Sequence, residues 1–156
     1  MGKEKVFMQE AISLSVENVS KGGGPFGAVI VKDDQIISRG VNSVTDIHDP
    51  TAHAEIMAIR EASKILGTHD LSDCIIYSSC EPCPMCMGAI LWARIQVMYY
   101  ACSRENAEKF GFNDAEFYIE INKPLQERKI KSVSLMQEEA LEAFKKWEEN
   151  PDKIEY

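Results

Sequence analysis

The sequence lacks any apolar run long enough to cross a membrane, and its N-terminus lacks the features of an export signal. A membrane helix needs roughly 18 consecutive apolar residues, and no segment approaches that length. The first residues, MGKEKVFMQEAI, are basic and then amphipathic, without an apolar centre followed by a small-residue cleavage site. Repeats and low-complexity tracts are also missing. We therefore expect a cytoplasmic protein with no membrane partner.

Positive charge is scarce as well. The chain of 156 residues has 17 Lys and Arg against 25 Asp and Glu, which gives a formal net charge of −8. Proteins that bind a nucleic-acid backbone use Lys and Arg to neutralise phosphates, so this balance argues against nucleic acid as a main partner. The 45% hydrophobic and 27% charged content is typical of one globular domain, here residues 1–156, with a core of its own.

Cysteines are few, but they are clustered. The sequence has five cysteines. Cys74, Cys80, Cys83 and Cys86 fall within thirteen residues, and the fifth is Cys102. A secreted disulfide scaffold typically has an even, spread set, so this pattern favours metal binding or redox chemistry in a reducing compartment. Cys74 and Cys102 lie in apolar segments, and we interpret both as small buried core residues.

The hydrophobic pattern predicts alternating helices and strands. Helical spacing of apolar residues or short helices is found at 4–20, 52–66, 84–93, 104–121 and 136–149. Short apolar runs typical of strands occupy 26–31, 35–41, 74–79, 95–101 and 130–135. This alternation predicts an α/β fold in which helices cover both faces of a sheet.

One pair of motifs carries the strongest chemical signal. His53-Ala54-Glu55 is followed by Pro82-Cys83-Pro84-Met85-Cys86, which matches the H-x-E…P-C-x-x-C signature of zinc deaminases. Imidazole nitrogen and thiolate sulfur are preferred zinc ligands, and a catalytic site uses three protein ligands and leaves the fourth position to water. His53, Cys83 and Cys86 supply such a set. We expect one catalytic zinc ion per subunit.

The local sequence also predicts how this site is built. Pro84 suits the first position of a helix, which makes Cys83 the N-cap and places both thiols at the positive end of the helix dipole. His53 precedes another helix, so we expect two helix N-termini to converge on one zinc. Glu55 is interpreted as the general acid and base that moves protons between water and substrate, and not as a ligand. The alternative for Glu55 is an acid that stabilises the helix dipole.

Two other metal-site interpretations remain open from the residues alone. A structural zinc site needs a fourth ligand, which Cys80, His48 or His69 could supply. A C-x-x-C pair can also serve redox chemistry, although such a pair has no use for the HAE element. A non-enzymatic zinc module that uses its cysteines only for folding is the corresponding alternative for the whole protein.

Residues 42–60 and 79–95 resemble the cytidine-deaminase-like zinc hydrolases. That resemblance implies a three-layer α/β/α sandwich around a mixed five-stranded sheet, and hydrolytic removal of an exocyclic amine from a nucleobase. Within this superfamily the sequence is most similar to the bacterial guanine deaminases, through GGPFGAVIVKD, DPTAHAEIMAIR, SCEPCPMCMGAI and GFNDAEFYIEINKP. The resemblance covers nearly the whole chain and implies conversion of guanine to xanthine and ammonia, a step of purine metabolism.

The same resemblance assigns roles to further residues. Asn42 is similar to the amide that reads the purine edge, and Phe26 to the aromatic ring that flanks the base. Ala54 offers its backbone beside the substrate, and Trp92 is a candidate wall of the pocket. Simpler alternatives are a turn residue for Asn42 and core packing for Phe26 and Trp92.

Two residues near the end of the chain also match the family. Asp114 resembles a second acid that passes protons to the departing amine, with a helix N-cap as the alternative. Tyr156 matches a C-terminal Tyr that closes over the substrate. In this family the C-terminal segment, here about 120–156, is exchanged between two subunits. The resemblance therefore implies a domain-swapped homodimer in which Tyr156 completes the partner's site.

Two other deaminase activities compete with the guanine interpretation. Residues 48–59 also fit the deaminases of adenosine in tRNA, but the net charge of −8 disfavours an RNA partner, and the only basic cluster is the short RKIK at 128–131. Another base or nucleoside, such as cytosine or guanosine, is the second alternative. The sequence does not give the pocket size that decides between base and nucleoside.

Overall fold

The computed structural model describes residues 2–156, and the chain divides into two compact units, one ending at Tyr118 and one spanning Ile119–Tyr156. The helices are α1 (Lys3–Ser20), α2 (Ala54–Leu66), α3 (Pro84–Trp92), α4 (Arg104–Glu108), α5 (Ala115–Asn122), the short 3-10 helix η1 (Leu125–Glu127) and α6 (Gln137–Glu149). The strands are β1 (Gly27–Lys32), β2 (Gln35–Val41), β3 (Ile75–Cys80) and β4 (Val97–Cys102). Across residues 2–156, no helix has both the length and the apolar character needed to cross a bilayer.

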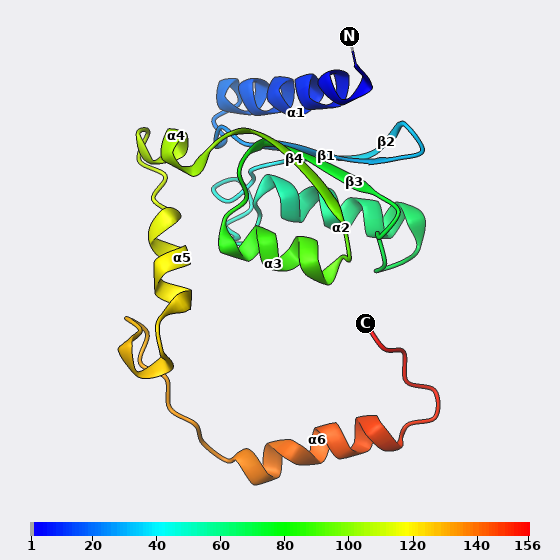
Figure 1. The fold of residues 1–156 in the computed structure, drawn as a ribbon, viewed down its shortest axis with the longest axis vertical. Coiled ribbons are helices and arrows are strands. Elements are labelled where there is room, and N and C mark those ends of the chain that lie inside the picture. Colours follow the sequence, from blue (N-terminus) through cyan, green and yellow to red (C-terminus); the bar gives the residue numbers. More distant parts are fainter. Residues whose placement is uncertain (1) are drawn as a thin grey trace. The chain divides into compact units, whose positions relative to one another are not determined.

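The first unit is a three-layer α/β/α sandwich around a mixed sheet, as predicted. The strand order is β2-β1-β3-β4; β1 runs antiparallel to β2 and β3, and β3 runs parallel to β4. Helix α1 packs on one face of the sheet, and α2 and α3 lie on the other (Figure 1).

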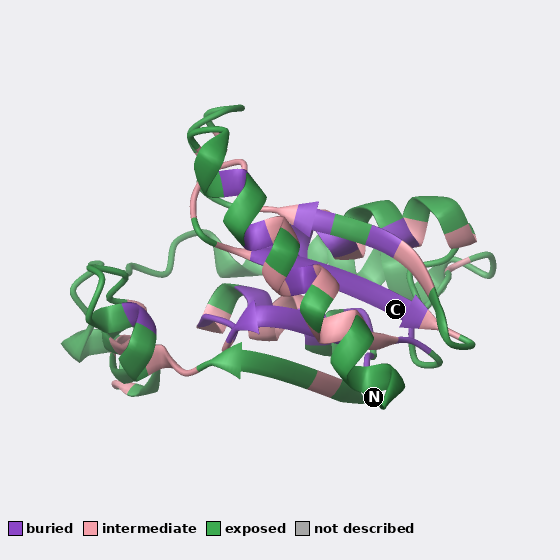
Figure 2. Ribbon diagram, turned by 90° about the horizontal axis from the view of Figure 1, so that it is seen from above, coloured by how far each residue is buried: buried purple, intermediate pink, exposed green. Residues whose placement is uncertain are grey.

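Strand β1 shows why a sheet covered on both faces forms here. Its residues from Gly27 to Val31 are all buried, and Figure 2 shows the central strands as the buried part of the unit. Because successive side chains of a strand point to opposite faces, Ala28 and Ile30 join the core under α2 while Val29 and Val31 join the core under α1. An apolar run without polar alternation is what such a doubly covered strand requires.

The prediction of a fifth strand is wrong. In the described part of the chain the sheet has four strands, and residues 130–135 form no regular element. This segment lies in the second unit, where Ile130, Val133 and Leu135 are all exposed. Strand propensity alone does not form a strand, because the backbone groups need a neighbouring strand to bond. Strand β4 is an edge strand of the sheet. Cys102 at its end is exposed, so the expectation that it is a buried core residue is wrong.

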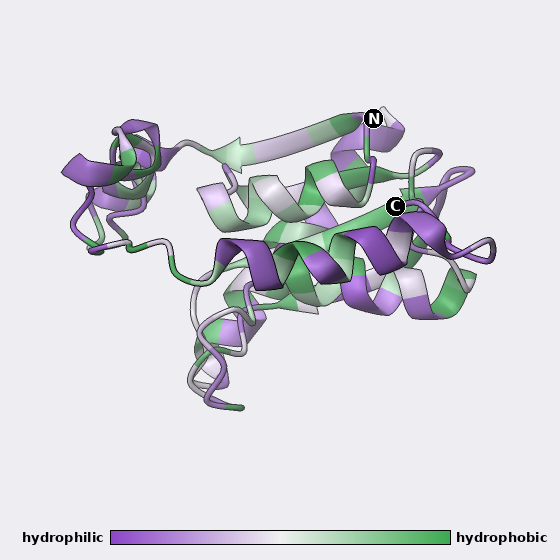
Figure 3. Cartoon of the chain, turned by 90° about the horizontal axis from the view of Figure 1, so that it is seen from below, coloured by the Kyte–Doolittle hydropathy of each residue, from purple (hydrophilic) through white to green (hydrophobic). Residues whose placement is uncertain are grey.

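The second unit is dominated by α6, whose helical pattern was predicted correctly. Figure 3 shows α6 as alternating hydrophilic and hydrophobic stripes. None of its residues is buried, and Leu141, Phe144 and Trp147 are exposed apolar side chains. The Trp147 and Tyr156 rings meet edge to face, with centroids 6.3 Å apart. An amphipathic helix normally buries its apolar face, so this unit does not satisfy α6 by itself.

Helix α2 lies unusually close to strand β2, and Gly40 makes this possible. A Cβ atom at Gly40 would lie 2.1 Å from the Ala54 carbonyl oxygen and 2.5 Å from the Ala58 nitrogen. Beside this contact, the Ser38 hydroxyl donates a 2.7 Å hydrogen bond to the Ala58 carbonyl. The first turn of α2 is therefore fixed against the sheet by a residue without a side chain.

Gly40→Ala is expected to lower the free energy of unfolding by about 1–3 kcal/mol, because α2 must then move away from β2 or strain its backbone. Urea denaturation measures this change. Gly88→Ala in α3 is the matched control, since a Cβ there meets no atom within 4 Å, and we expect it to be neutral or slightly stabilising. Equal stabilities of the two variants would contradict the packing argument.

Candidate metal centre and active site

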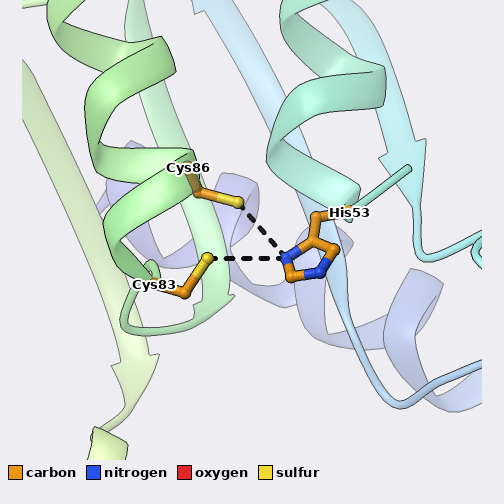
Figure 4. Close-up of side chains that lie close together, drawn as sticks. All are labelled: His53, Cys83 and Cys86. Atoms are coloured by element: carbon orange, nitrogen blue, oxygen red, sulfur yellow. Dashed lines mark hydrogen bonds between the residues drawn. The ribbon is translucent and has the colours of Figure 1, made fainter. Parts of the chain in front are cut away.

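Three side chains from two helix N-termini meet at one point. His53 is the N-cap residue of α2, Cys83 is the N-cap residue of α3, and Cys86 lies in the first turn of α3. The Nδ1 atom of His53 lies 3.6 Å from the Cys83 sulfur and 3.5 Å from the Cys86 sulfur, and Figure 4 shows all three side chains pointing to a common centre. The two helix N-termini thus converge as the sequence predicted.

The spacing and the donor atoms fit zinc. A tetrahedral zinc ion with Zn–S about 2.3 Å and Zn–N about 2.0 Å places a ligating sulfur and nitrogen about 3.5 Å apart. The two sulfur–nitrogen distances here have this length. In residues 2–156 the group of candidate metal ligands contains these three residues and no fourth. The structural-zinc alternative, with Cys80, His48 or His69 as a fourth ligand, is therefore not favoured.

The backbone explains why these side chains are presented together. Pro84 occupies the first position of α3, where no backbone donor is lost, and it fixes Cys83 as the cap. The first helical hydrogen bonds then run from Met87 to the Cys83 carbonyl, 2.8 Å, and from Met57 to the His53 carbonyl, 2.9 Å. Both ligand sets therefore lie where the helix dipole is positive, which favours thiolate.

The electrostatics of the cysteine pair agree with a metal-binding role. A hydrogen bond from Cys86, together with the nearby His53, lowers the pKa of Cys83 to about 4. The same contact with Cys83, and burial, raise the pKa of Cys86. Contact with Cys83 also raises the pKa of His53. The lowered pKa of Cys83 favours the thiolate, which is the form of cysteine that binds metals.

Glu55 lies in the first turn of α2 and faces this centre from below the surface. Glu55 is only 6% exposed. One carboxylate oxygen accepts a 3.2 Å hydrogen bond from the Ser78 hydroxyl, and the other accepts a 3.4 Å bond from the Cys86 thiol. Burial raises the pKa of Glu55, and a carboxyl group at this place can act as a general acid and base.

A cavity of about 640 Å³ opens beside these residues. It brings together six of the predicted site residues, which come from segments far apart in the sequence: Phe26, Asn42, His53, Glu55, Cys83 and Asp114. Cys86 is fully buried behind them. A concave site that combines apolar walls with a few convergent polar groups is typical of a small-molecule binding site.

Phe26 and Asn42 form one wall of the cavity. They face each other at the open end of the hairpin of β1 and β2, where the Asn42 backbone nitrogen donates to the Phe26 carbonyl at 3.2 Å. The Phe26 ring also packs edge to face against Phe112, with centroids 4.8 Å apart. The wall therefore presents an aromatic ring and an amide, the two kinds of group that a planar base requires.

Asp114 also lines the cavity and lies immediately before α5. Burial raises the pKa of its carboxyl group, and the nearby Cys83 adds to this. One turn later, the Tyr118 hydroxyl donates a 2.8 Å hydrogen bond to the carbonyl of Pro82, directly before Cys83. The start of α5 is thus tied to the loop that carries a metal ligand.

A charged cluster supports the same loop. The Arg104 guanidinium pairs with the Glu81 carboxylate at 3.0 Å and lies over the Tyr118 ring, 4.3 Å from its centroid. The Arg104 backbone nitrogen also donates to Glu81 at 3.1 Å. No local sequence pattern indicates this cluster, because its members come from three separate segments and belong to no short motif.

Two predicted residues, Ala54 and Trp92, do not line this cavity. Ala54 is fully buried between His53 and Glu55, and Trp92 is 68% exposed at the end of α3. In the described residues neither is part of the cavity wall. Tyr156 belongs to the second unit, and its proposed closing role stays a prediction, as do those of Ala54 and Trp92.

Comparison with known proteins shows the family. The model of the cytidine and deoxycytidylate deaminase zinc-binding region matches residues 1–102. The chain belongs to this deaminase family. The zinc-binding motif of the family is therefore present, and His53, Cys83 and Cys86 are positioned to bind one metal ion.

Several members of the deaminase family are similar over long stretches. Guanine deaminase of Bacillus subtilis is 50% identical over 153 residues, 97% of this chain and 98% of that protein. Its crystal structure superimposes over the same shares of the two chains with a TM-score of 0.94. The tRNA-specific adenosine deaminase of Aquifex aeolicus is 44% identical over 101 residues, 65% of this chain and 66% of that protein. The structure of guanine deaminase from Nitrosomonas europaea is 34% identical, covers 69% of this chain and 63% of that one, and has a TM-score of 0.66.

Proposed function

We propose that this protein is a zinc-dependent guanine deaminase, which converts guanine and water to xanthine and ammonia. The observation that carries the proposal is the cavity in which Glu55 faces the His53–Cys83–Cys86 group, with Asn42 and Phe26 on the wall. The identity of 50% with Bacillus subtilis guanine deaminase extends over nearly the whole length of both chains. The similarity to the tRNA-specific adenosine deaminase of Aquifex aeolicus covers about two thirds of each chain.

The roles of the residues follow from their chemistry. His53, Cys83 and Cys86 would hold the zinc ion, which would act as a Lewis acid and lower the pKa of a water molecule towards about 7. Glu55 accepts the proton of that water, and its buried carboxyl group passes the proton to the ring nitrogen next to carbon 2 of guanine. Carbon 2 gains the water oxygen and loses the exocyclic amine. Glu55 then takes the remaining proton from the added oxygen and, with Asp114 as a second acid, delivers it to the amine, so that ammonia departs and the carbonyl at carbon 2 forms.

The cavity wall orients the purine. Phe26 and Phe112 offer ring surfaces to a flat heterocycle, and the Asn42 amide offers both a donor and an acceptor to the purine edge. Glu55 is buried beside the metal ligands, so the protein around its carboxylate excludes bulk water. This arrangement suits a planar nucleobase.

Ammonia release from a panel of substrates tests the proposal. The zinc-loaded protein is incubated with guanine, guanosine, cytosine, cytidine, adenine and a tRNA stem-loop. We expect release from guanine alone. Release from the stem-loop would identify the RNA enzyme, which the net charge of −8 disfavours, and release from guanosine or cytosine would identify the second alternative. Release from none of them would contradict a deaminase activity.

We also propose that the active unit is a homodimer that exchanges its C-terminal segments, from about residue 120 to Tyr156. The apolar face of α6 and the edge strand β4 are both exposed, and such surfaces are normally buried by contact with another surface. A second copy of the chain offers the same two surfaces, so two copies can bury them in a symmetric dimer. In this arrangement Tyr156 of each chain closes the cavity of the other.

Complementation between two defective chains tests the exchange. Glu55→Gln removes the proton carrier, and Tyr156→Ala removes the closing ring, so each variant alone should be nearly inactive. When equal amounts are refolded together, a swapped heterodimer contains one site with both residues intact. Half of the dimers are then mixed, and activity returns to about a quarter of the wild-type value. Absence of any recovery in a mixture that does form heterodimers would contradict the exchange.

We further propose that the protein works in the cytoplasm. All five cysteines are free, and two of them are metal ligands that must stay reduced. A reducing compartment preserves these thiols, whereas an oxidising one would favour loss of the metal site.

A further inference from the structure

A buried amide outside the known motif joins two parts of the cavity wall. Asn18 lies in the last turn of α1 and is 9% exposed. Its side-chain nitrogen donates to the Gly24 carbonyl and to the Asn42 carbonyl, each at 2.8 Å. A side-chain amide nitrogen carries two hydrogens, so both are used, one for each partner.

The two partners of Asn18 belong to segments that line the cavity. Gly24 ends the loop of Gly22, Gly23 and Gly24, and Asn42 follows β2. The Gly24 carbonyl also accepts from the Phe26 nitrogen at 2.8 Å, and the Phe26 carbonyl accepts from the Asn42 nitrogen at 3.2 Å. These bonds form a closed ring in which Asn18 connects the two ends.

Packing keeps the amide in one orientation. The Gly23 nitrogen donates to the Asn18 backbone carbonyl at 2.9 Å. A Cβ atom at Gly23 would lie 2.4 Å from the Asn18 side-chain nitrogen, so the loop backbone lies directly against the amide. The positive φ of 86° at Gly22 begins this tight return of the chain. Asn18 therefore has little space to rotate away from its two acceptors.

We propose that Asn18 is a positioning residue for substrate binding, which fixes the wall formed by the glycine loop, Phe26 and Asn42. The inference rests on the proposed function, because it assumes that this wall holds the purine. Asn18 is separate from the elements that carry Glu55 and the metal ligands, α2 and α3. Its loss should weaken binding of guanine and leave proton transfer almost unchanged.

Two variants and a matched control test this role. Asn18→Ala removes both hydrogen bonds, and the isosteric Asn18→Asp keeps the shape but offers acceptors where donors are needed. Ser15→Ala is the control: Ser15 lies on the same helix and is 8% exposed, and within residues 2–156 its hydroxyl donates to the Ile12 carbonyl of α1 itself. We expect KM for guanine to rise at least about tenfold in both Asn18 variants, with kcat changed less than about threefold. Ser15→Ala should leave both constants within about twofold of the wild type.

Hydrogen–deuterium exchange provides a readout that needs no catalysis. Backbone amides in residues 22–26 and 42–45 should exchange faster in both Asn18 variants than in Ser15→Ala, while those of α2 and α3 should not. An unchanged KM, or equal exchange of these segments in Asn18→Asp and Ser15→Ala, would overturn the inference. If the wild type releases no ammonia from guanine, the proposed function fails, and the exchange experiment still decides whether Asn18 fixes the wall.

Discussion

Replacing Glu55 by Gln is expected to lower kcat for guanine by about 100- to 10,000-fold, which is the range that a positioned general acid and base contributes. The amide has nearly the same shape as the carboxylate and can still contact Ser78, so the cavity should be preserved. It cannot accept the proton of water or return it to the purine. KM for guanine should change much less than kcat, since the change removes an interaction made only in the transition state.

Metal content separates this chemical role from a structural one. Elemental analysis of Glu55→Gln should give the same zinc content as the wild type, because the three metal ligands are unaltered. Glu61→Gln is the control, since Glu61 is an exposed residue of the same helix. A Glu55→Gln protein that keeps most of its turnover would rule out the proposed mechanism.

Removing one metal ligand should have the second largest effect. Cys83→Ser and Cys86→Ser are each expected to lower zinc content to below about a tenth of an ion per chain and to abolish detectable ammonia release. Both changes should also lower the thermal unfolding temperature, because metal binding contributes to folding when the ligands come from separate elements. Zinc analysis, activity and thermal unfolding are measured on the same preparations.

Cys102→Ser is the control for these substitutions. Cys102 is an exposed thiol on the edge strand β4 and lies outside the group of candidate ligands. The Cys102→Ser variant should keep its zinc and its activity.

In the wild type, a chelator should remove zinc more readily as the pH falls, because protons compete with the metal for the thiolates. A Cys83→Ser variant with full zinc content would show that the metal is held elsewhere.

The sequence predicted the first unit well because its signals are local. Residues 26–31 form an apolar run, and the Gly22–Gly24 tract ends the first helix, as expected. Pro84 and its neighbours fixed both the start of α3 and the position of Cys83 as its cap. Helices α1 to α3 and strands β1 to β4 lie within about two residues of their predicted bounds, whereas the mixed range 104–121 contains two short helices, α4 and α5.

The prediction failed where a segment depends on a distant partner. Residues 130–135 have the composition of a strand, but the backbone of an isolated segment has nothing to pair with. Asn18 was missed for a related reason. A single Asn in a helical pattern is a weak signal, and its two acceptors lie 6 and 24 residues further along the chain. Phe112 was missed too, because its contact with Phe26 joins residues far apart in sequence.

The sequence by itself determined the kind of chemistry. His53, Glu55, Cys83 and Cys86 form a motif whose donor atoms and spacing specify a zinc site with a neighbouring proton carrier. The tertiary structure decided how these groups meet, because two helix N-termini must converge to place a nitrogen and two sulfurs at zinc-binding distances. It also decided the cavity wall, since close packing at Gly40 and the hydrogen bonds of Asn18 act between segments that no local pattern relates. Local spacing encodes ligands and helix caps, whereas the shape of a binding site depends on contacts that exist only once the chain has folded.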